Sequence, residues 1–349
     1  MEKTLKELKC PTSKFDPALY FNIDEETEEL KGMLMTHVDD IMYGTGDDDF
    51  EEKVMKPLKT KFEFGSEEES IFRYVGMQVQ QHAQSIVVNF DHYLENLEAP
   101  EREAFEDIQG DKLVNDETQT EFRSLVGKLG WLAKNARPDL GYDGLVMSTK
   151  VGKATADDMK QLVKLVKKMK AEVTEMKFID IGPVCDWIIE GHGDAGYKSL
   201  PDKVSSCGGQ VISVKNKTTG AQCVVSWRSK KLKRVVTSST AAEAMAVNDT
   251  LDEMVYIKEV LKEALGRDAE SISMELYTDS RNLHKSVMST SLNENPRLRA
   301  DVAKLQESLK TGELSKFYQI SGQEMLADCL TKKGASSEKL RRILRRGKP

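Results

Sequence analysis

Hydrophobic runs and polar segments alternate in the second half of the chain in a way that predicts three strands, a long helix, a further strand and more helices. Five strands are expected, at Val184–Glu190, Gly209–Val214, Cys223–Trp227, Ser273–Tyr277 and Lys316–Ile320. After the third strand, Ser238-Ser239-Thr240 is a cluster of N-cap residues, and the helix that it begins should end at Gly266. A late helix is expected to begin with Glu324–Leu330.

Short apolar runs joined by turns characterise the first half of the chain. The apolar run Lys31–Tyr43 is interrupted by Asp39 and Asp40, which predicts a β-hairpin with two carboxylates at its tip. The elements expected after it are a helix at Phe50–Phe62 and a pair of strands at Phe72–Val79 and Gln84–Asn89.

A polar stretch and a helical region separate these two halves. Asp107–Glu121 is predicted to be a linker, and Phe122–Met176 is predicted to be mostly helical because apolar residues recur at three- and four-residue spacing. The fold class is therefore mixed, α+β with α/β character. The expected divisions are residues 1–105, a helical region at 106–178, a mixed domain at 179–335 and a basic C-terminal tail at 336–349.

Length and charge limit the number of domains and the class of protein, but they do not identify a binding partner. A chain of 349 residues is long enough for two domains. Its net charge of -7 argues, taken alone, against a simple nucleic-acid-binding module, which is usually basic. The basic residues are unevenly spread, however, because Thr331–Pro349 holds eight of them against the single acidic Glu338. The binding partner must therefore be inferred from local clusters of charged residues and not from the net charge.

Cysteine usage and hydropathy bear on the compartment. The five cysteines are scattered and odd in number, which is typical of buried reduced thiols and not of a disulfide framework or a zinc site. No apolar stretch approaches the ~20 residues of a membrane helix, and the charged N-terminus lacks the apolar core of a signal peptide. We expect a cytoplasmic or nuclear protein with no membrane partner.

Four carboxylates stand at the ends or starts of successive elements in the second half. Asp194 is expected after the first strand, Glu243 one turn into the long helix, Asp279 at the end of the fourth strand, and Asp328 in the late helix. Phosphodiester hydrolysis by two metal ions needs carboxylates that converge from distant parts of a chain. Any single aspartate among 58 acidic residues is more simply a solvated group or a helix cap. Four in order are harder to obtain by chance.

The order and context of these carboxylates resemble the Asp-Glu-Asp-Asp set of RNase H. The flanking segments further resemble the RNase H domain of copia-type LTR retrotransposon polyproteins. These segments are VVSWRSKK (Val224–Lys231), SSTAAEAMA (Ser238–Ala246) and ADCLTKK (Ala327–Lys333). The sequence departs from the family at two positions where a second acidic residue is usual, because Ala241 and Gly196 stand there.

The resemblance implies a fold, a cofactor and a substrate. It implies an RNase H-like five-stranded mixed sheet with flanking helices, in which Mg²⁺ or Mn²⁺ supports cleavage of the RNA strand of an RNA/DNA hybrid. The metal ligands that it implies are Asp194, Glu243, Asp279 and Asp328. The side chains that it places near the phosphates of the hybrid are those of Trp227, Arg228, Lys230 and Lys231.

The first half resembles the reverse transcriptase of the same family. His37-Val38-Asp39-Asp40 is similar to the Tyr-x-Asp-Asp box, so Asp39 and Asp40 are candidate catalytic residues of a polymerase palm. The segments that continue the family order are FRYVGMQV (Phe72–Val79), VVNFDHYLENL (Val87–Leu97) and FRSLVGKLGWLAKNARPDL (Phe122–Leu140). The expected units are a partial palm at 1–105 and a helical thumb or connection at 106–178.

Three functions remain open at this point. The residues before the hairpin are too few for the fingers and the earlier catalytic aspartate of the family, so we expect an incomplete polymerase and an active RNase H. The second possibility is a catalytically inactive retroelement relic that binds nucleic acid. The third is a reverse transcriptase that works only when its missing N-terminal parts come from another chain. The sequence does not predict an oligomeric state.

Overall fold

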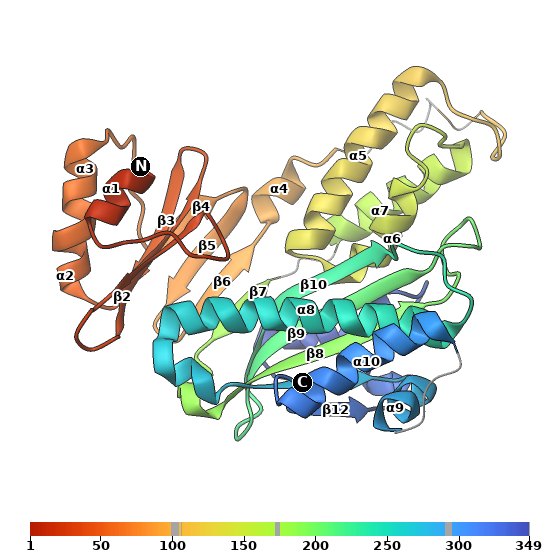
Figure 1. Ribbon diagram of the computed structural model, residues 1–349. Helices are drawn as coiled ribbons and strands as arrows, with labels where there is room; N and C mark the ends of the chain where they lie inside the picture. The colour runs from red at the N-terminus through yellow and green to blue at the C-terminus, as the bar shows by residue number, and fades with distance from the viewer. Residues whose placement is uncertain (99–104, 106, 172–174, 290–294, 349) are drawn as a thin grey trace.

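The chain forms three units, an N-terminal pair of small sheets, a helical unit and a C-terminal mixed domain (Figure 1). The structure, a computed structural model, describes residues 1–98, 105, 107–171, 175–289 and 295–348. Residue 106, where the helical region was expected to begin, lies outside the described residues. No helix within these ranges is both long and apolar enough to cross a membrane.

A three-stranded antiparallel sheet begins the N-terminal unit. Its strands are β1 (Leu19–Ile23), β2 (Leu30–His37) and β3 (Asp40–Thr45). The β2–β3 hairpin was predicted from the sequence and is confirmed, with Val38 at a positive φ in the turn. The helical segments of this unit are α1 (Glu2–Glu7), α2 (Asp48–Phe50), a π-helical turn at Glu51–Met55 and α3 (Lys56–Lys61), so the helix expected at Phe50–Phe62 is also confirmed.

A four-stranded antiparallel sheet follows, and its last strand comes from far along the chain. Its strands are β4 (Ile71–Tyr74), β5 (Met77–His82), β6 (Ser85–Asn89) and β7 (Met176–Ile179), and the short helix α4 (Asp91–Glu95) follows β6. The prediction of one strand at Phe72–Val79 was wrong. Gly76, with φ of +77°, allows a tight turn that folds this segment into a hairpin.

The helical unit confirms the predicted helices and shortens the predicted linker. Its helices are α5 (Asp116–Asn135), a 3-10 turn at Pro138–Leu140, α6 (Gly141–Ser148) and α7 (Ala156–Ala171). The linker expected at Asp107–Glu121 ends earlier because Asn115 caps α5, accepting a hydrogen bond from the Thr118 amide at 2.8 Å.

The C-terminal domain is built on a five-stranded mixed sheet, as the family resemblance implies. Its strands are β8 (Trp187–Gly196), β9 (Cys207–Asn216), β10 (Gln222–Lys231), β11 (Ser273–Thr278) and β12 (Lys316–Gln319). Their order in the sheet is β10-β9-β8-β11-β12. The first three strands are antiparallel, and β11 lies parallel to both β8 and β12. This order defines an RNase H-like fold.

Helices cover both faces of this sheet. The long helix α8 (Ser239–Leu265) begins at the N-cap Ser238 and ends at Gly266, as predicted, and it crosses the front of the sheet in Figure 1. The other helical segments are 3-10 turns at Val184–Asp186, Gly266–Ser271, Gly322–Glu324 and Leu326–Leu330, and the helices α9 (Arg281–Met288), α10 (Pro296–Thr311) and α11 (Glu338–Arg346). The prediction that a late helix begins with Glu324–Leu330 was wrong, because this stretch contains the end of one 3-10 turn and a second one at Leu326–Leu330.

The first strand of the sheet differs most from its prediction. Val184–Asp186 is a 3-10 turn, and β8 extends six residues beyond the predicted end at Glu190. The extension is buried and pairs with β9 along its whole length, and its glycines let α8 lie against the sheet. A Cβ at Gly193 would be 2.8 Å from Thr250 Oγ1 and 3.0 Å from Val247 Cα. Close packing of α8 therefore requires glycine there.

One hydrophobic core joins the helical unit to the back of the five-stranded sheet. It includes Leu129 and Leu132 of α5, Val211 of β9, and Leu330 beside the sheet. Residues 336–349, predicted as a basic tail, contain α11, whose Leu340, Ile343 and Leu344 are buried in the same core. The helical unit and the C-terminal domain therefore pack as neighbours around shared side chains.

A buried ion pair stabilises the turn between α5 and α6. The guanidinium of Arg137 donates to the two carboxylate oxygens of Asp139 at 2.8 and 2.9 Å, and the exposed fractions of the two side chains are 1% and 0%. Burial opposes the charge of Asp139, but Arg137 outweighs it and lowers the pKa of that carboxyl. Breaking such a pair leaves an uncompensated buried charge.

Arg137→Met should destabilise the protein by about 3–5 kcal/mol, because the Asp139 carboxylate keeps only the weaker attraction of Arg341 and of the Lys168 ammonium, which lies 3.9 Å away. The double variant Arg137→Met/Asp139→Leu should recover part of this loss. Lys168→Met, which removes a partly exposed partner, should cost less than about 1 kcal/mol. Urea unfolding followed by circular dichroism measures all three, and equal losses in Arg137→Met and Lys168→Met would contradict the account.

Candidate active site

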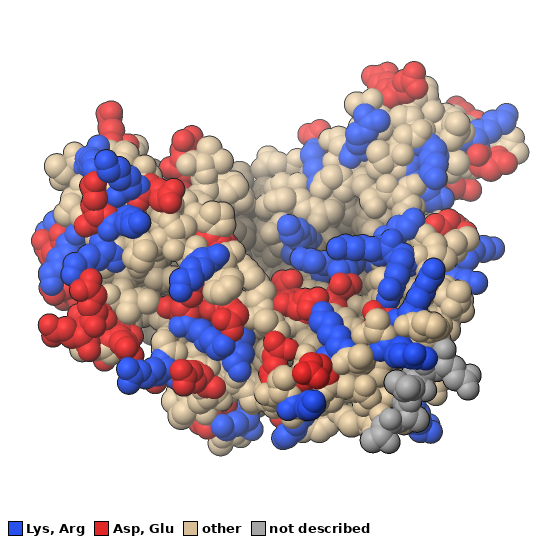
Figure 2. Space-filling model, in the orientation of Figure 1, with Lys and Arg blue, Asp and Glu red and all other residues tan. Residues whose placement is uncertain are grey.

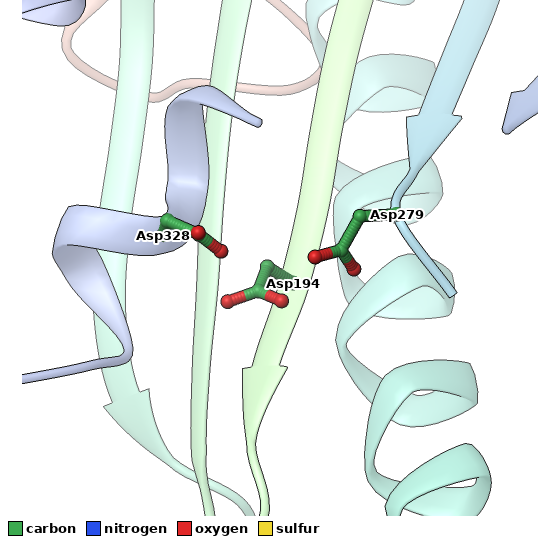
Figure 3. Close-up of side chains that lie close together, drawn as sticks. All are labelled: Asp194, Asp279 and Asp328. Carbon is green, nitrogen blue, oxygen red and sulfur yellow. The ribbon is translucent and has the colours of Figure 1, made fainter. Parts of the chain in front are cut away.

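Three aspartates from distant parts of the chain converge at one end of the five-stranded sheet. The side chains of Asp194, Asp279 and Asp328 point toward one another in Figure 3. One carboxylate oxygen from each lies within 4.8 Å of the others, and among the described residues this is the one group of three possible metal ligands so close together. The first of them is fully buried and the other two are partly exposed.

Strand register brings the first two aspartates together. Parallel pairing of β8 with β11 runs up to His192 opposite Tyr277. Asp194 and Asp279 each lie two residues beyond this last pair, Asp194 still inside β8 and Asp279 just after the end of β11, so they stand at the same level of the sheet. Asp194 is therefore inside β8 and not after it, which corrects its predicted position. Asp279 directly follows β11, as predicted.

The third aspartate belongs to the 3-10 segment Leu326–Leu330, which packs beside β8 and β9. Two backbone hydrogen bonds close the turn after it, from the amides of Thr331 and Lys332 to the Asp328 carbonyl at 3.1 and 3.0 Å. This turn carries the side chains of residues 331 and 332 back toward the sheet.

Glu243, the fourth predicted ligand, lies beside this group without belonging to it. Its Oε2 accepts a hydrogen bond from the amide of Ala195 at 3.2 Å, and its side chain is buried in the first turns of α8. It is near enough for the charges of Asp194 and Asp279 to affect its protonation. The structure thus places all four predicted carboxylates in one region and brings three of them together.

Two residues that the sequence did not single out contact the aspartates directly. The Thr331 hydroxyl donates to Asp194 Oδ2. The Lys332 ammonium lies 2.6 Å from Asp328 Oδ1, 3.2 Å from Asp194 Oδ1 and 3.8 Å from Asp279 Oδ2. In the sequence Lys332 is one of many basic residues near the C-terminus. Its contacts with Asp194 and Asp279 join segments far apart in the chain, so no local pattern predicts them.

Close packing around Gly196 leaves no room for a side chain at this position. A Cβ at this position would overlap the Thr331 carbonyl and Ser199. The second aspartate that the family usually carries here is therefore replaced by a close approach of the 3-10 turn to β8. This approach places Thr331 against Asp194.

Burial and mutual repulsion dominate the electrostatics of the group. Burial raises the pKa of Asp194; Lys332 and Thr331 oppose this shift, and Asp328 and Asp279 add to it. Burial, followed by the charges of Asp194 and Asp279, raises the pKa of Glu243. Burial disfavours the Lys332 ammonium, but the three aspartates outweigh it and raise its pKa. The region attracts cations strongly.

The donor set fits a hard divalent cation. Carboxylate oxygens are the ligands that Mg²⁺ and Mn²⁺ prefer, and these ions are usually held by a few carboxylates and water. The three aspartates supply such oxygens, and an ammonium group already lies among them. Asp194, Asp279 and Asp328 are therefore the residues that would hold a divalent ion.

The basic residues predicted to contact nucleic acid lie on and beside the edge strand β10. Lys and Arg side chains gather over the end of this strand in Figure 2. Each of the three is ion-paired: Arg228 with Glu253, Lys230 with Asp249, and Lys231 with Asp202. Their nitrogen–oxygen distances are 3.7, 2.8 and 3.6 Å.

Trp227 is placed differently from its predicted neighbours. Its indole Nε1 donates to the carbonyl of Ala133 in α5 at 2.8 Å, and its ring packs against the core shared with the helical unit. This placement favours a packing role between two units over a contact with phosphate.

The pair Asp39 and Asp40 is remote from this group. Both are exposed at the β2–β3 turn, and within the described ranges no third carboxylate, histidine or cysteine completes a metal-ligand group with them. His284 in α9 packs against Phe317, with ring centroids 5.5 Å apart.

Glu243→Gln should stabilise the metal-free protein at pH 8, on the order of 2 kcal/mol. The folded-state pKa of Glu243 is raised, so its contribution to stability is present below the ordinary glutamate range and is lost as the pH rises toward the raised value. The glutamine amide does not ionise, so the variant does not lose this stability. Urea unfolding in EDTA at pH 5 and pH 8 gives the free energy of unfolding of the variant and the wild type, with Glu259→Gln on the same helix as the control. An advantage of Glu243→Gln that fails to grow with pH would contradict this assignment.

Comparison with known proteins gives relatives for part of the chain. No protein-family model matches it. The retrovirus-related Pol polyproteins from transposons RE1 and RE2 of Arabidopsis thaliana are each 28% identical to it over 220 residues, which is 61% of this chain. The chain spans 14% of the length of these curated relatives.

Solved structures with some likeness include RNase H1 from Halobacterium salinarum, at 18% identity and a TM-score of 0.30, covering 41% of this chain and 93% of that one. LC11-RNase H1 in complex with an RNA/DNA hybrid has the same identity and TM-score, covering 42% and 93%. A foamy viral protease–reverse transcriptase in complex with double-stranded DNA has 15% identity and a TM-score of 0.22, covering 82% and 47%. The copia type stays a prediction. The chain is thus similar to retrovirus-related Pol polyproteins over 61% of its length.

Proposed function

We propose that the C-terminal domain is a metal-dependent ribonuclease that hydrolyses the RNA strand of RNA/DNA hybrids. One observation carries the proposal: oxygens of Asp194, Asp279 and Asp328 from three separate elements lie within 4.8 Å of one another on an RNase H-like sheet. A carboxylate that is buried beside two others loses hydration and is repelled by both, so this placement does not by itself stabilise the charged group. Three of them kept together are typical of a site that binds a divalent cation.

Each carboxylate has a distinct task in this proposal. Asp194, fully buried and fixed by β8, anchors the site, while Asp279 and Asp328 reach it from opposite sides (Figure 3). Glu243 lies next to them and would join when a second ion is held. Divalent ions, when bound, lower the pKa of water and offset the charge that develops on the phosphate.

The substrate class rests on the family resemblance and on the charges around β10. Arg228, Lys230 and Lys231 are basic groups on one strand, and basic groups that contact phosphates position a nucleic acid without reading its sequence. Their present ion pairs with acidic side chains would be exchanged for phosphate contacts. Polymerase activity is not proposed, because Asp39 and Asp40 lack a third ligand among the described residues.

A catalytically silent protein that binds hybrid nucleic acid is the second candidate. The observation in its favour is that the Lys332 ammonium already balances the aspartates, which then have less need of a metal ion. It shares the basic surface of the first candidate and predicts binding without turnover.

Asp194→Asn should lower the rate of Mg²⁺-dependent cleavage of a labelled RNA/DNA hybrid at least about 100-fold, because the buried carboxylate that anchors the site loses its charge. Asp39→Asn makes the same chemical change at an exposed turn far from the site and should cleave like the wild type. The assay compares both variants with the wild type, with Mg²⁺ and with EDTA, on hybrid and on double-stranded DNA.

Circular dichroism melting confirms that each variant is folded. Folded wild-type protein that binds the hybrid in a salt-sensitive way, yet never cleaves it with Mg²⁺ or Mn²⁺, would establish the silent candidate instead. Equal cleavage by wild type and Asp194→Asn would show that the nuclease site is elsewhere.

A further inference from the structure

The Lys332 ammonium occupies the space that a cation bound by the three aspartates would need. It approaches one oxygen of each carboxylate, at 2.6 Å from Asp328, 3.2 Å from Asp194 and 3.8 Å from Asp279. Among the aspartates, Asp194 is fully buried, so it depends on neighbouring groups and not on water to balance its charge. The ammonium supplies that balance.

The backbone holds Lys332 in this place. Its amide donates to the Asp328 carbonyl at 3.0 Å, so the turn that fixes the third aspartate also fixes the origin of the lysine side chain. Thr331, just before it, donates its hydroxyl to Asp194. The lysine thus reaches the aspartates from a short turn that packs on the sheet, and not from a mobile surface segment.

The side chain is nevertheless free to leave without disturbing the core. Its exposed fraction is 40%, whereas the structural cation Arg137 is 1% exposed. An ammonium group is a compact charge on a flexible stem, which can move into solvent by rotation of side-chain bonds. Arg137 would have to break the packing of the helical unit to do the same.

We propose that Lys332 is a built-in counter-ion that holds the three aspartates together in the metal-free protein and that a divalent cation must displace. The inference rests on the proposed metal-dependent function for the identity of that cation. Both cations need the same oxygens, so each weakens the binding of the other, and the coupling is reciprocal. Lys332 is a positioning residue of the site in this account and not a ligand.

The competition predicts opposite effects of one substitution on two measurements. Lys332→Met should lower the melting temperature in EDTA, because the aspartates lose their counter-ion. The same variant should bind Mn²⁺ about tenfold more tightly, within the usual range of such couplings. Lys332→Arg keeps the charge and should restore the melting temperature. Lys333→Met removes an equal charge from the neighbouring exposed residue and should leave the Mn²⁺ affinity unchanged, with only a small change in melting temperature from its weak attraction to Asp143.

Isothermal titration with Mn²⁺ alone, on the whole chain without nucleic acid, gives the affinities. A second measurement uses only wild-type protein and holds even where Lys332→Met fails to fold. Reductive methylation followed by mass spectrometry should modify Lys332 several-fold faster when Mg²⁺ is present, with Lys333 as the internal reference.

The outcomes separate the two proposals. Tighter Mn²⁺ binding by Lys332→Met, or faster methylation of Lys332 with Mg²⁺, supports the displacement. Wild-type protein that binds Mn²⁺ through Asp194, with unchanged affinity in Lys332→Met and unchanged methylation, overturns the inference and leaves the nuclease proposal standing. Wild-type protein that binds no divalent ion overturns both.

Discussion

Repulsion among carboxylates at the end of β8 is the constraint on which the C-terminal domain depends. Parallel pairing with β11 brings Asp194 and Asp279 to one level, and Asp328 closes the group from a 3-10 turn. Burial makes this repulsion costly, because little water is present to screen it. A cation is therefore required at this point of the fold, and Lys332 supplies it from within the chain.

The position of that turn depends on the helical unit. Ser229 of β10 donates its hydroxyl to the Leu330 carbonyl at 2.6 Å, and a Cβ at Gly141 of α6 would press on both residues. The indole of Trp227 donates to Ala133 of α5 at 2.8 Å. The helices thus pack against the strand and the turn that deliver Asp328 and Lys332. The C-terminal domain is completed by the helical unit, and a cut between them would expose their shared core.

Local signals were the most reliable guides to this structure. The cap at Ser238 and the stop at Gly266 fixed the long helix because both act within one turn of the chain. The family resemblance implied a five-stranded mixed sheet, and the structure contains one. Alternation alone did not predict the full length of β8, because its glycines are explained only by the helix that packs on them.

Long-range contacts account for what the sequence left undetermined. In the sequence Lys332 is one basic residue among many. Its contact with Asp194, which is far from it along the chain, becomes apparent only in the folded structure. β7 extends the N-terminal sheet although more than eighty residues separate it from β6. Trp227 lies in a basic segment but turns its ring inward. Each of these depends on which segments meet in space, and periodicity carries no such information.

The most direct test of the account is a crystal structure of the whole chain soaked in Mn²⁺, with anomalous diffraction measured at the manganese edge. We predict an anomalous peak among the carboxylates of Asp194, Asp279 and Asp328, with the Lys332 ammonium turned away from them. An empty cluster that still holds the ammonium, with manganese bound only at other acidic residues, would contradict it.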